Sequence, residues 1–182
     1  MAARLGRLLA LALLLLGVAA APAAASLSDD RYDGNIFALY AGNGSLVPPR
    51  SSLAEALAAH RSAVLVYYLD DSAVSKRFSP VVSELQRTWG NSIELIPLVT
   101  DPLQGRPEQG PSDPAHYWKG TIPQVVVLDG EGRVLLDQSG AVGIDAVNAA
   151  VSRATGIPLR PQAGPSTTRS FNELNSEVVS GS

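Results

Sequence analysis

Two serines, Ser72 and Ser75, lie three residues apart, where an apolar segment gives way to an amphipathic one. A serine hydroxyl acts as a nucleophile only when a base beside it takes its proton. The two histidines of the chain, His60 and His116, are isolated, and neither has the spacing of a metal ligand. The alternative interpretation is structural, because serines at the start of a helix accept hydrogen bonds from its free N–H groups. Both interpretations stay open, and the sequence favours the structural one.

Other catalytic chemistry finds little support in the residues. The chain contains no cysteine, so it lacks the thiolate that disulfide exchange requires. Motifs of metalloproteases, of serine hydrolases and of nucleotide-binding proteins do not occur either. The pair Asp70-Asp71 follows an apolar segment, where carboxylates usually cap the next helix. We therefore predict no catalytic residue, no metal and no cofactor, and keep an enzyme with a non-thiol site as an alternative.

The pattern of apolar residues predicts strands and helices in alternation. Ser52 and Glu55 have the spacing of a capping box, and Asp129 to Gly132 predicts a hairpin turn. Pro97 indicates an edge strand or an unpaired position. The predicted strands are 35–40, 63–69, 93–99, 124–128 and 133–136, and the predicted helices are 52–60, a segment ending at Trp89, and 144–154. Four prolines between Pro102 and Ala115 predict an exposed loop. This order predicts an α/β fold with a mixed central sheet and helices on both faces.

The segment from Ala63 to Gly156 resembles the thioredoxin fold, a three-layer fold. Its strand at Val64 to Tyr68, the Ser72-x-x-Ser75 turn and the helix containing Pro80 look like the strand, active-site turn and kinked helix of that family. Serine stands at both cysteine positions. The resemblance therefore implies that the scaffold is kept and its redox chemistry removed.

The stretch Lys119-Gly-Thr-Ile-Pro123 is similar to the family's loop with a cis-proline, which favours a cis bond before Pro123. In thioredoxin-like proteins this loop lies beside the active-site turn and can bind an extended segment by strand addition. The resemblance thus implies a recognition surface made by Ser72, Ser75, Ile122 and Pro123. Tyr117 and Trp118 precede the loop, and we expect them either to be exposed aromatic anchors or to cover the edge of the sheet.

Four segments look like a cyanobacterial group of thioredoxin-like thylakoid proteins that is associated with accumulation of photosystem I. They are Leu69–Ser72, Ser79–Ser83, Ile122–Val127 and Phe171–Asn175. The resemblance implies an exported factor, in the thylakoid lumen or on the lumenal face of the membrane, that assists assembly by binding photosystem I subunits or assembly intermediates. The resemblance assigns no catalytic residues to this chain. The alternatives are a passive structural subunit of a membrane complex and a periplasmic address.

Residues 1–25 are predicted to be an export signal peptide. They have a basic start, an apolar run and the small residues Ala23 to Ala25 before Ser26, although an uncleaved anchor is the alternative. The remaining chain has 12 basic and 17 acidic residues, a formal charge of −5, which argues against nucleic acid as a partner. We predict one thioredoxin-like domain over 26–157. A proline-rich linker and a short helix follow over 158–182, and this helix docks on its own domain or on a partner.

Overall fold

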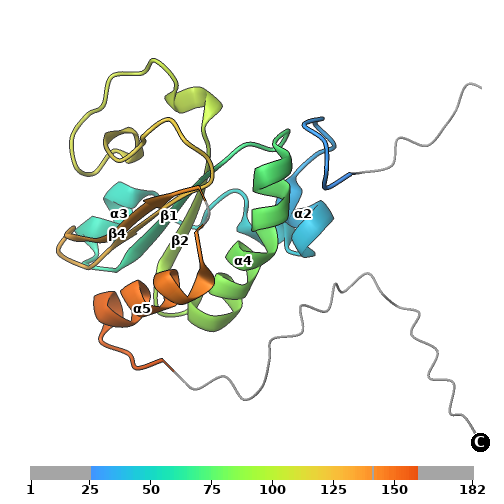
Figure 1. The fold of residues 1–182 in the computed structure, drawn as a ribbon. Helices are drawn as coiled ribbons and strands as arrows, with labels where there is room; N and C mark the ends of the chain where they lie inside the picture. The colour runs from blue at the N-terminus through green and yellow to red at the C-terminus, as the bar shows by residue number, and fades with distance from the viewer. Residues whose placement is uncertain (1–25, 141, 160–182) are drawn as a thin grey trace, which may run out of the picture.

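The computed structural model describes residues 26–140 and 142–159 (Figure 1). The predicted signal peptide, 1–25, and the predicted helix near the C-terminus lie outside the described residues. None of the helices within the described ranges combines the length and the apolar character needed to cross a bilayer.

A four-stranded mixed sheet forms the centre of the molecule. Its strands are β1 (Ala63–Tyr68), β2 (Glu94–Val99), β3 (Gln124–Leu128) and β4 (Val134–Ser139), in the order β2-β1-β3-β4. β1 runs parallel to β2 and antiparallel to β3, and β3 pairs with β4 across the predicted hairpin turn. Every residue of β1 and β3 is buried, as expected for apolar strands in the middle of a covered sheet. β2 lies at the edge of the sheet, which confirms the prediction from Pro97.

Helices cover both faces of this sheet, and the predicted fold class is therefore confirmed (Figure 1). On one face, α4 (Ala73–Trp89) and α5 (Ile144–Thr155) pack against the strands, and α2 (Ile36–Ala41) packs on α4. On the other face lie α3 (Leu53–Ala58) and the long loop between β2 and β3. Short 3₁₀ turns occur at Gly44–Leu46, Asp101–Leu103 and Pro114–His116.

The segment predicted as the first strand, 35–40, is instead the helix α2. The Asn35 side chain accepts hydrogen bonds from the N–H groups of Phe37 and Ala38, both at 3.0 Å, and Gly42 ends the helix with a φ of 60°. Such caps favour a helix over a strand, and α4 supplies an apolar surface that buries Ile36 and Phe37. A short apolar run does not by itself distinguish the two structures.

Helix α4 continues through Pro80 because a side chain compensates for its missing donor. Proline has no N–H, so the carbonyl of Lys76 loses its usual partner four residues ahead. The hydroxyl of Ser79 donates to that carbonyl at 2.9 Å. α4 is therefore one continuous helix between its N-cap, Ser72, and its C-cap, Gly90.

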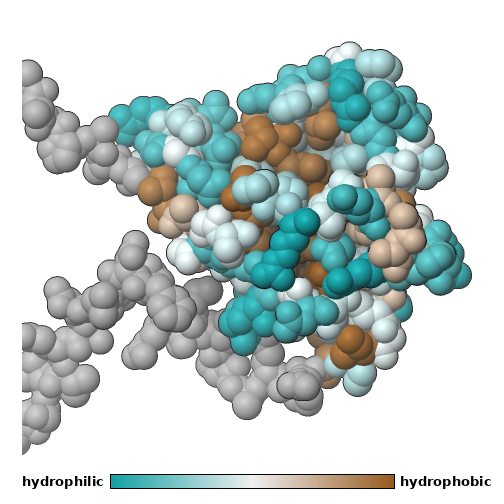
Figure 2. All heavy atoms as spheres, turned by 180° about the vertical axis from the view of Figure 1, so that it is seen from behind, coloured by the Kyte–Doolittle hydropathy of each residue, from teal (hydrophilic) through white to brown (hydrophobic). Residues whose placement is uncertain are grey.

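The surface of the molecule is uneven in polarity. Figure 2, which shows the side opposite to that of Figure 1, has hydrophobic residues gathered in its upper middle, with hydrophilic residues around them. Val74 at the start of α4 and Val134 at the start of β4 are each 44% exposed.

Candidate functional site

The Ser72 turn and the Pro123 loop lie at the same end of the sheet. Tyr67, near the end of β1, pairs with Gln124, the first residue of β3. Ser72 follows β1 after a short turn, and Pro123 immediately precedes β3. The Ile122–Pro123 peptide bond is cis, the form favoured by the resemblance. The topology thus places the two segments as the sequence interpretation requires.

Both serine hydroxyls bind backbone groups. The Ser72 hydroxyl accepts a hydrogen bond from the N–H of Ser75 at 3.5 Å, at the start of α4. Ser75 is 1% exposed, and its hydroxyl accepts from the N–H of Leu69 at 3.1 Å. His116 contacts Glu108 in the long loop instead of either serine. The structure therefore shows structural roles for both serines, Ser72 as the N-cap of α4 and Ser75 as a partner of the turn before it, and it does not build a serine–histidine site within the described residues.

The two aromatic residues before the loop differ in their surroundings. Tyr117 is 8% exposed and its hydroxyl donates to the carbonyl of Pro111 at 2.8 Å. Trp118 is half-buried and stacks on Tyr67, with ring centroids 5.2 Å apart. Tyr117 is thus a packing residue, the alternative to an exposed anchor. Trp118 and Ile122 keep part of their surface accessible, whereas Pro123 is buried.

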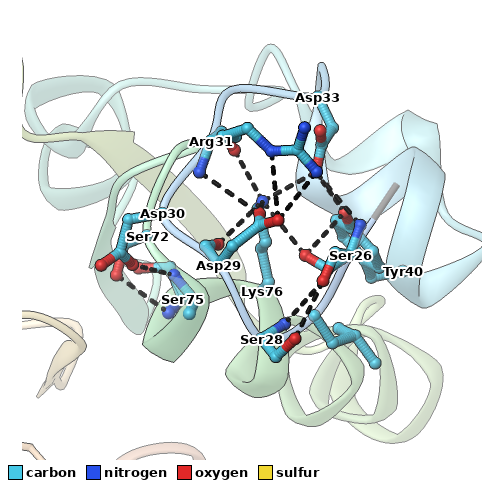
Figure 3. A network of polar contacts seen from close by, with 12 residues as sticks. Ser26, Ser28, Asp29, Asp30, Arg31, Asp33, Tyr40, Ser72, Ser75 and Lys76 are labelled. Carbon is cyan, nitrogen blue, oxygen red and sulfur yellow. Dashed lines mark hydrogen bonds and ion pairs between the residues drawn. The ribbon is translucent and has the colours of Figure 1, made fainter. Parts of the chain in front are cut away.

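Lys76, which follows Ser75 in α4, is held by a segment that the sequence did not connect to it. We call residues 26–33 the N-terminal strap. The side chain of Lys76 is fully buried, and its Nζ donates to the carbonyls of Arg31 at 2.6 Å, Asp29 at 3.1 Å and Ser26 at 3.2 Å, and to Oδ2 of Asp33 at 2.7 Å. Figure 3 shows the strap looping around the tip of the lysine. These acceptors provide the hydrogen bonds that an ammonium group makes to water when it is exposed.

The strap also caps the helix beside the Ser72 turn. Oδ1 of Asp30 accepts a hydrogen bond from the N–H of Ala73, the first residue of α4, at 2.7 Å (Figure 3). Oδ1 of Asp70 also accepts from the N–H of Ile36, the first residue of α2, at 3.0 Å. The turn is therefore fastened to the strap and to α2, while Val74, the residue after Ala73, stays exposed.

The whole-chain comparison decides the family. The sequence is 38% identical over 180 residues to "Thylakoid membrane protein slr1796" of the cyanobacterium Synechocystis sp., and the match covers 94% of this chain and 90% of that protein. The chain belongs to the family of this thylakoid membrane protein. No family model matches the sequence.

Three solved structures are similar to this chain at low sequence identity. The exposed lipoprotein thioredoxin Etrx1 of Streptococcus pneumoniae superposes with a TM-score of 0.43 at 14% identity, covering 53% of this chain and 89% of that one. A yeast mitochondrial 1-Cys peroxiredoxin superposes with a TM-score of 0.41 at 14% identity, covering 55% of this chain and 85% of that one. A DsbH oxidoreductase superposes with a TM-score of 0.31 at 17% identity, covering 59% of this chain and 84% of that one. The sheet order and the helices on its two faces define the thioredoxin-like fold of this family member.

Charge and hydrogen bonding keep Lys76 and Asp33 ionised. Hydrogen bonds from Lys76 and from the hydroxyl of Tyr40, at 2.6 Å, lower the pKa of Asp33 to about 2. Burial by itself lowers the pKa of Lys76, but the hydrogen bond and the negative charge of Asp33 outweigh burial, so that its pKa is raised. Both side chains are therefore charged at every pH between the pKa of Asp33 and the pKa of Lys76.

This pair predicts how strap docking depends on pH. The folded pKa of Asp33 lies below its ordinary value of 3.8, so its stabilising effect is present above about pH 4 and disappears toward pH 2. For Lys76 the sign is opposite, and its contribution disappears only as the pH rises beyond about 10.5. We expect the difference in thermal midpoint between wild type and Asp33→Asn to be constant from pH 5 to pH 7 and to narrow below pH 4. A difference that persists unchanged to pH 2 contradicts this assignment.

Proposed function

We propose that this protein is a non-catalytic thioredoxin-like factor that assists the biogenesis, assembly or stability of photosystem I at the thylakoid membrane through protein–protein binding. The observation that carries the proposal is the Ser72 turn. It keeps the position of a thioredoxin active site, but it has no thiol, and its two hydroxyls bind backbone N–H groups. The named relative, described as a thylakoid membrane protein, supports the location.

The proposed binding surface lies at the end of the sheet beside this turn. We call it the sheet-end surface, made by Ser72, Val74, Trp118 and Ile122. Val74 is exposed, and the other three are half-buried. Apolar side chains with partial exposure can be covered by a partner at a low cost in desolvation. The partners that we propose are photosystem I subunits or assembly intermediates, reached from the lumenal side after export.

A deletion strain tests the role. If the protein assists photosystem I, its loss lowers the amount of photosystem I and leaves photosystem II close to the wild-type level. Spectroscopic quantification of both reaction centres in the same membranes gives the ratio directly. Equal levels of both photosystems in the deletion strain and the wild type contradict the proposed role.

A matched pair of variants tests the surface separately. We expect the double variant Val74→Ser and Ile122→Ser to retain about one tenth of the wild-type capture of photosystem I subunits from solubilised thylakoid membranes. Val134→Ser is the control, because Val134 is as exposed as Val74 but pairs with Leu128 at the opposite end of the sheet. Unchanged capture by the double variant would remove the sheet-end surface, while the proposed role would still stand on the deletion strain.

A further inference from the structure

The backbone of Ser26, the first described residue, is part of the Lys76 cluster. Its N–H lies 3.4 Å from Oδ2 of Asp33, and its carbonyl accepts hydrogen bonds from the Tyr40 hydroxyl and from Nζ of Lys76, both at 3.2 Å. Figure 3 shows Ser26, Asp33 and Tyr40 meeting beside the lysine. The leader is predicted to be removed immediately before this residue. The bond to be cut is thus the one that joins the leader to the cluster.

The charged groups around Ser26 have a net negative charge, which favours one more cation. The strap carries the carboxylates of Asp29, Asp30 and Asp33, against the cations of Arg31 and Lys76. Arg31 pairs with Asp29 at 2.9 Å, and Lys76 pairs with Asp33 at 2.7 Å. The carboxylate of Asp30 accepts its hydrogen bond from a neutral group, the backbone N–H of Ala73. One negative charge is therefore in excess within the strap and its lysine.

The remaining charged groups near this region leave it acidic. Arg77, from α4, donates to the carbonyl of Leu27 at 3.2 Å, and Asp70, from the end of β1, accepts from the N–H of Ile36. The charges of Arg77 and Asp70 offset one another, and Asp71, beside Asp70, adds a further negative charge. Tyr40, from α2, is neutral at physiological pH, since burial and the neighbouring Asp33 raise the pKa of its hydroxyl.

We propose that cleavage before Ser26 creates an α-ammonium group that binds the Asp33 carboxylate, so that the N-terminal strap becomes fully fastened only in the processed protein. The proposal rests on the predicted cleavage and is independent of the proposed function. In the reaction, a signal peptidase hydrolyses the bond between Ala25 and Ser26. Water supplies the hydroxyl of the Ala25 carboxyl group and a proton to the Ser26 nitrogen, which takes up a further proton from solvent.

The change of charge gives the proposal a measurable consequence. A neutral amide N–H is replaced by an ammonium group with three donors, and hydrogen bonds between charged partners are about twice as strong as neutral ones. Lys76 repels the new cation, but both cations share the same carboxylate. An α-amino group ordinarily titrates at about pH 7.7–8.0, and the Asp33 carboxylate favours its charged form. The added stability is therefore present below about pH 8 and disappears as the pH rises further.

The experiment compares two starts of the chain. One protein begins at Ser26 with a free amine, and the other carries Ala23 to Ala25 in front of Ser26. We expect the first to unfold about 2–5 °C higher at pH 6.5, and the difference to shrink by pH 10. In the Asp33→Asn background the two starts should unfold at the same temperature. Equal midpoints in the wild-type background at pH 6.5 would overturn the proposal.

A second measurement remains informative if Asp33→Asn does not fold. Acylation of the α-amine requires its neutral form, so binding to Asp33 slows acylation at pH 7.5. We expect the folded Ser26 protein to react about tenfold more slowly than the same protein unfolded in urea. Equal rates contradict the contact. Terminal sequencing of the protein isolated from cells checks the cleavage itself, and a retained leader or a start at another residue also overturns the proposal.

Discussion

Lys76→Met is expected to release the N-terminal strap and to lower the thermal midpoint by about 5–10 °C. Methionine keeps most of the length and volume of the side chain but has no proton to donate. The carboxylate of Asp33 and the carbonyls of Ser26 and Arg31 then lose the ammonium group that they share. Breaking one side of a buried ion pair is costly because the other side stays behind without compensation.

The measurement is hydrogen exchange of residues 26–40 together with thermal unfolding. We expect faster exchange of the strap amides in Lys76→Met, while the sheet remains protected up to the new midpoint. Lys119→Met is the matched control, because the side chain of Lys119 is 58% exposed and its pair with Asp137 lies at the surface, where ion pairs contribute little. If strap exchange and midpoint equal those of the control, Asp30 and the other contacts hold the strap without Lys76.

The elements that the sequence predicts well are those with local signals. The capping box of Ser52 and Glu55 is present, and Asp129 accepts hydrogen bonds within the predicted hairpin turn from the N–H groups of Glu131 and Arg133. Those bonds join residues close in the chain, so their types and spacing reveal them. Helix α2 also has local caps, Asn35 and Gly42, but its apolar run has the length and composition of a strand. These two caps are the local signal that distinguishes this helix from a strand.

The residues of the candidate site also differ in whether their partners lie near them in the chain or far away. The two serines bind backbone groups within six residues of themselves, and the sequence favours such a structural role over a functional one. Lys76, in contrast, meets strap residues that lie 43 to 50 residues earlier in the chain, and no short pattern links them. One signal was available: Lys76 lies on the buried stripe of α4 with Ser75, Phe78 and Ser79. A lysine on such a stripe needs an acidic partner, and the aspartates at 29, 30 and 33 are concentrated in one short segment.

Gln124 fastens the loop that carries Trp118 and precedes Ile122. The side chain is fully buried, and its Nε2 donates to the carbonyl of Tyr117 at 2.7 Å and to Oδ1 of Asp137 at 2.9 Å. Its Oε1 accepts from the N–H of Lys119 at 3.0 Å. One amide therefore joins the loop to both strands of the β3–β4 hairpin, directly after the cis-proline. The positions of Trp118 and Ile122 in the sheet-end surface depend on these three hydrogen bonds.

Gln124→Met is expected to cost about 2–3 kcal/mol of unfolding free energy, because it removes three hydrogen bonds at nearly constant volume and leaves their partners partly unsatisfied. Urea unfolding measures the loss, and Gln104→Met, at an exposed position of the same long loop, should stay within about 0.5 kcal/mol of wild type. Because the loop also positions Ile122, capture of photosystem I subunits should fall in Gln124→Met at temperatures where the variant is still folded. Weakened stability with full capture would mean that the partner binds the surface without needing this loop to be fixed in advance. Loss of both would tie the binding surface to the amide that anchors it.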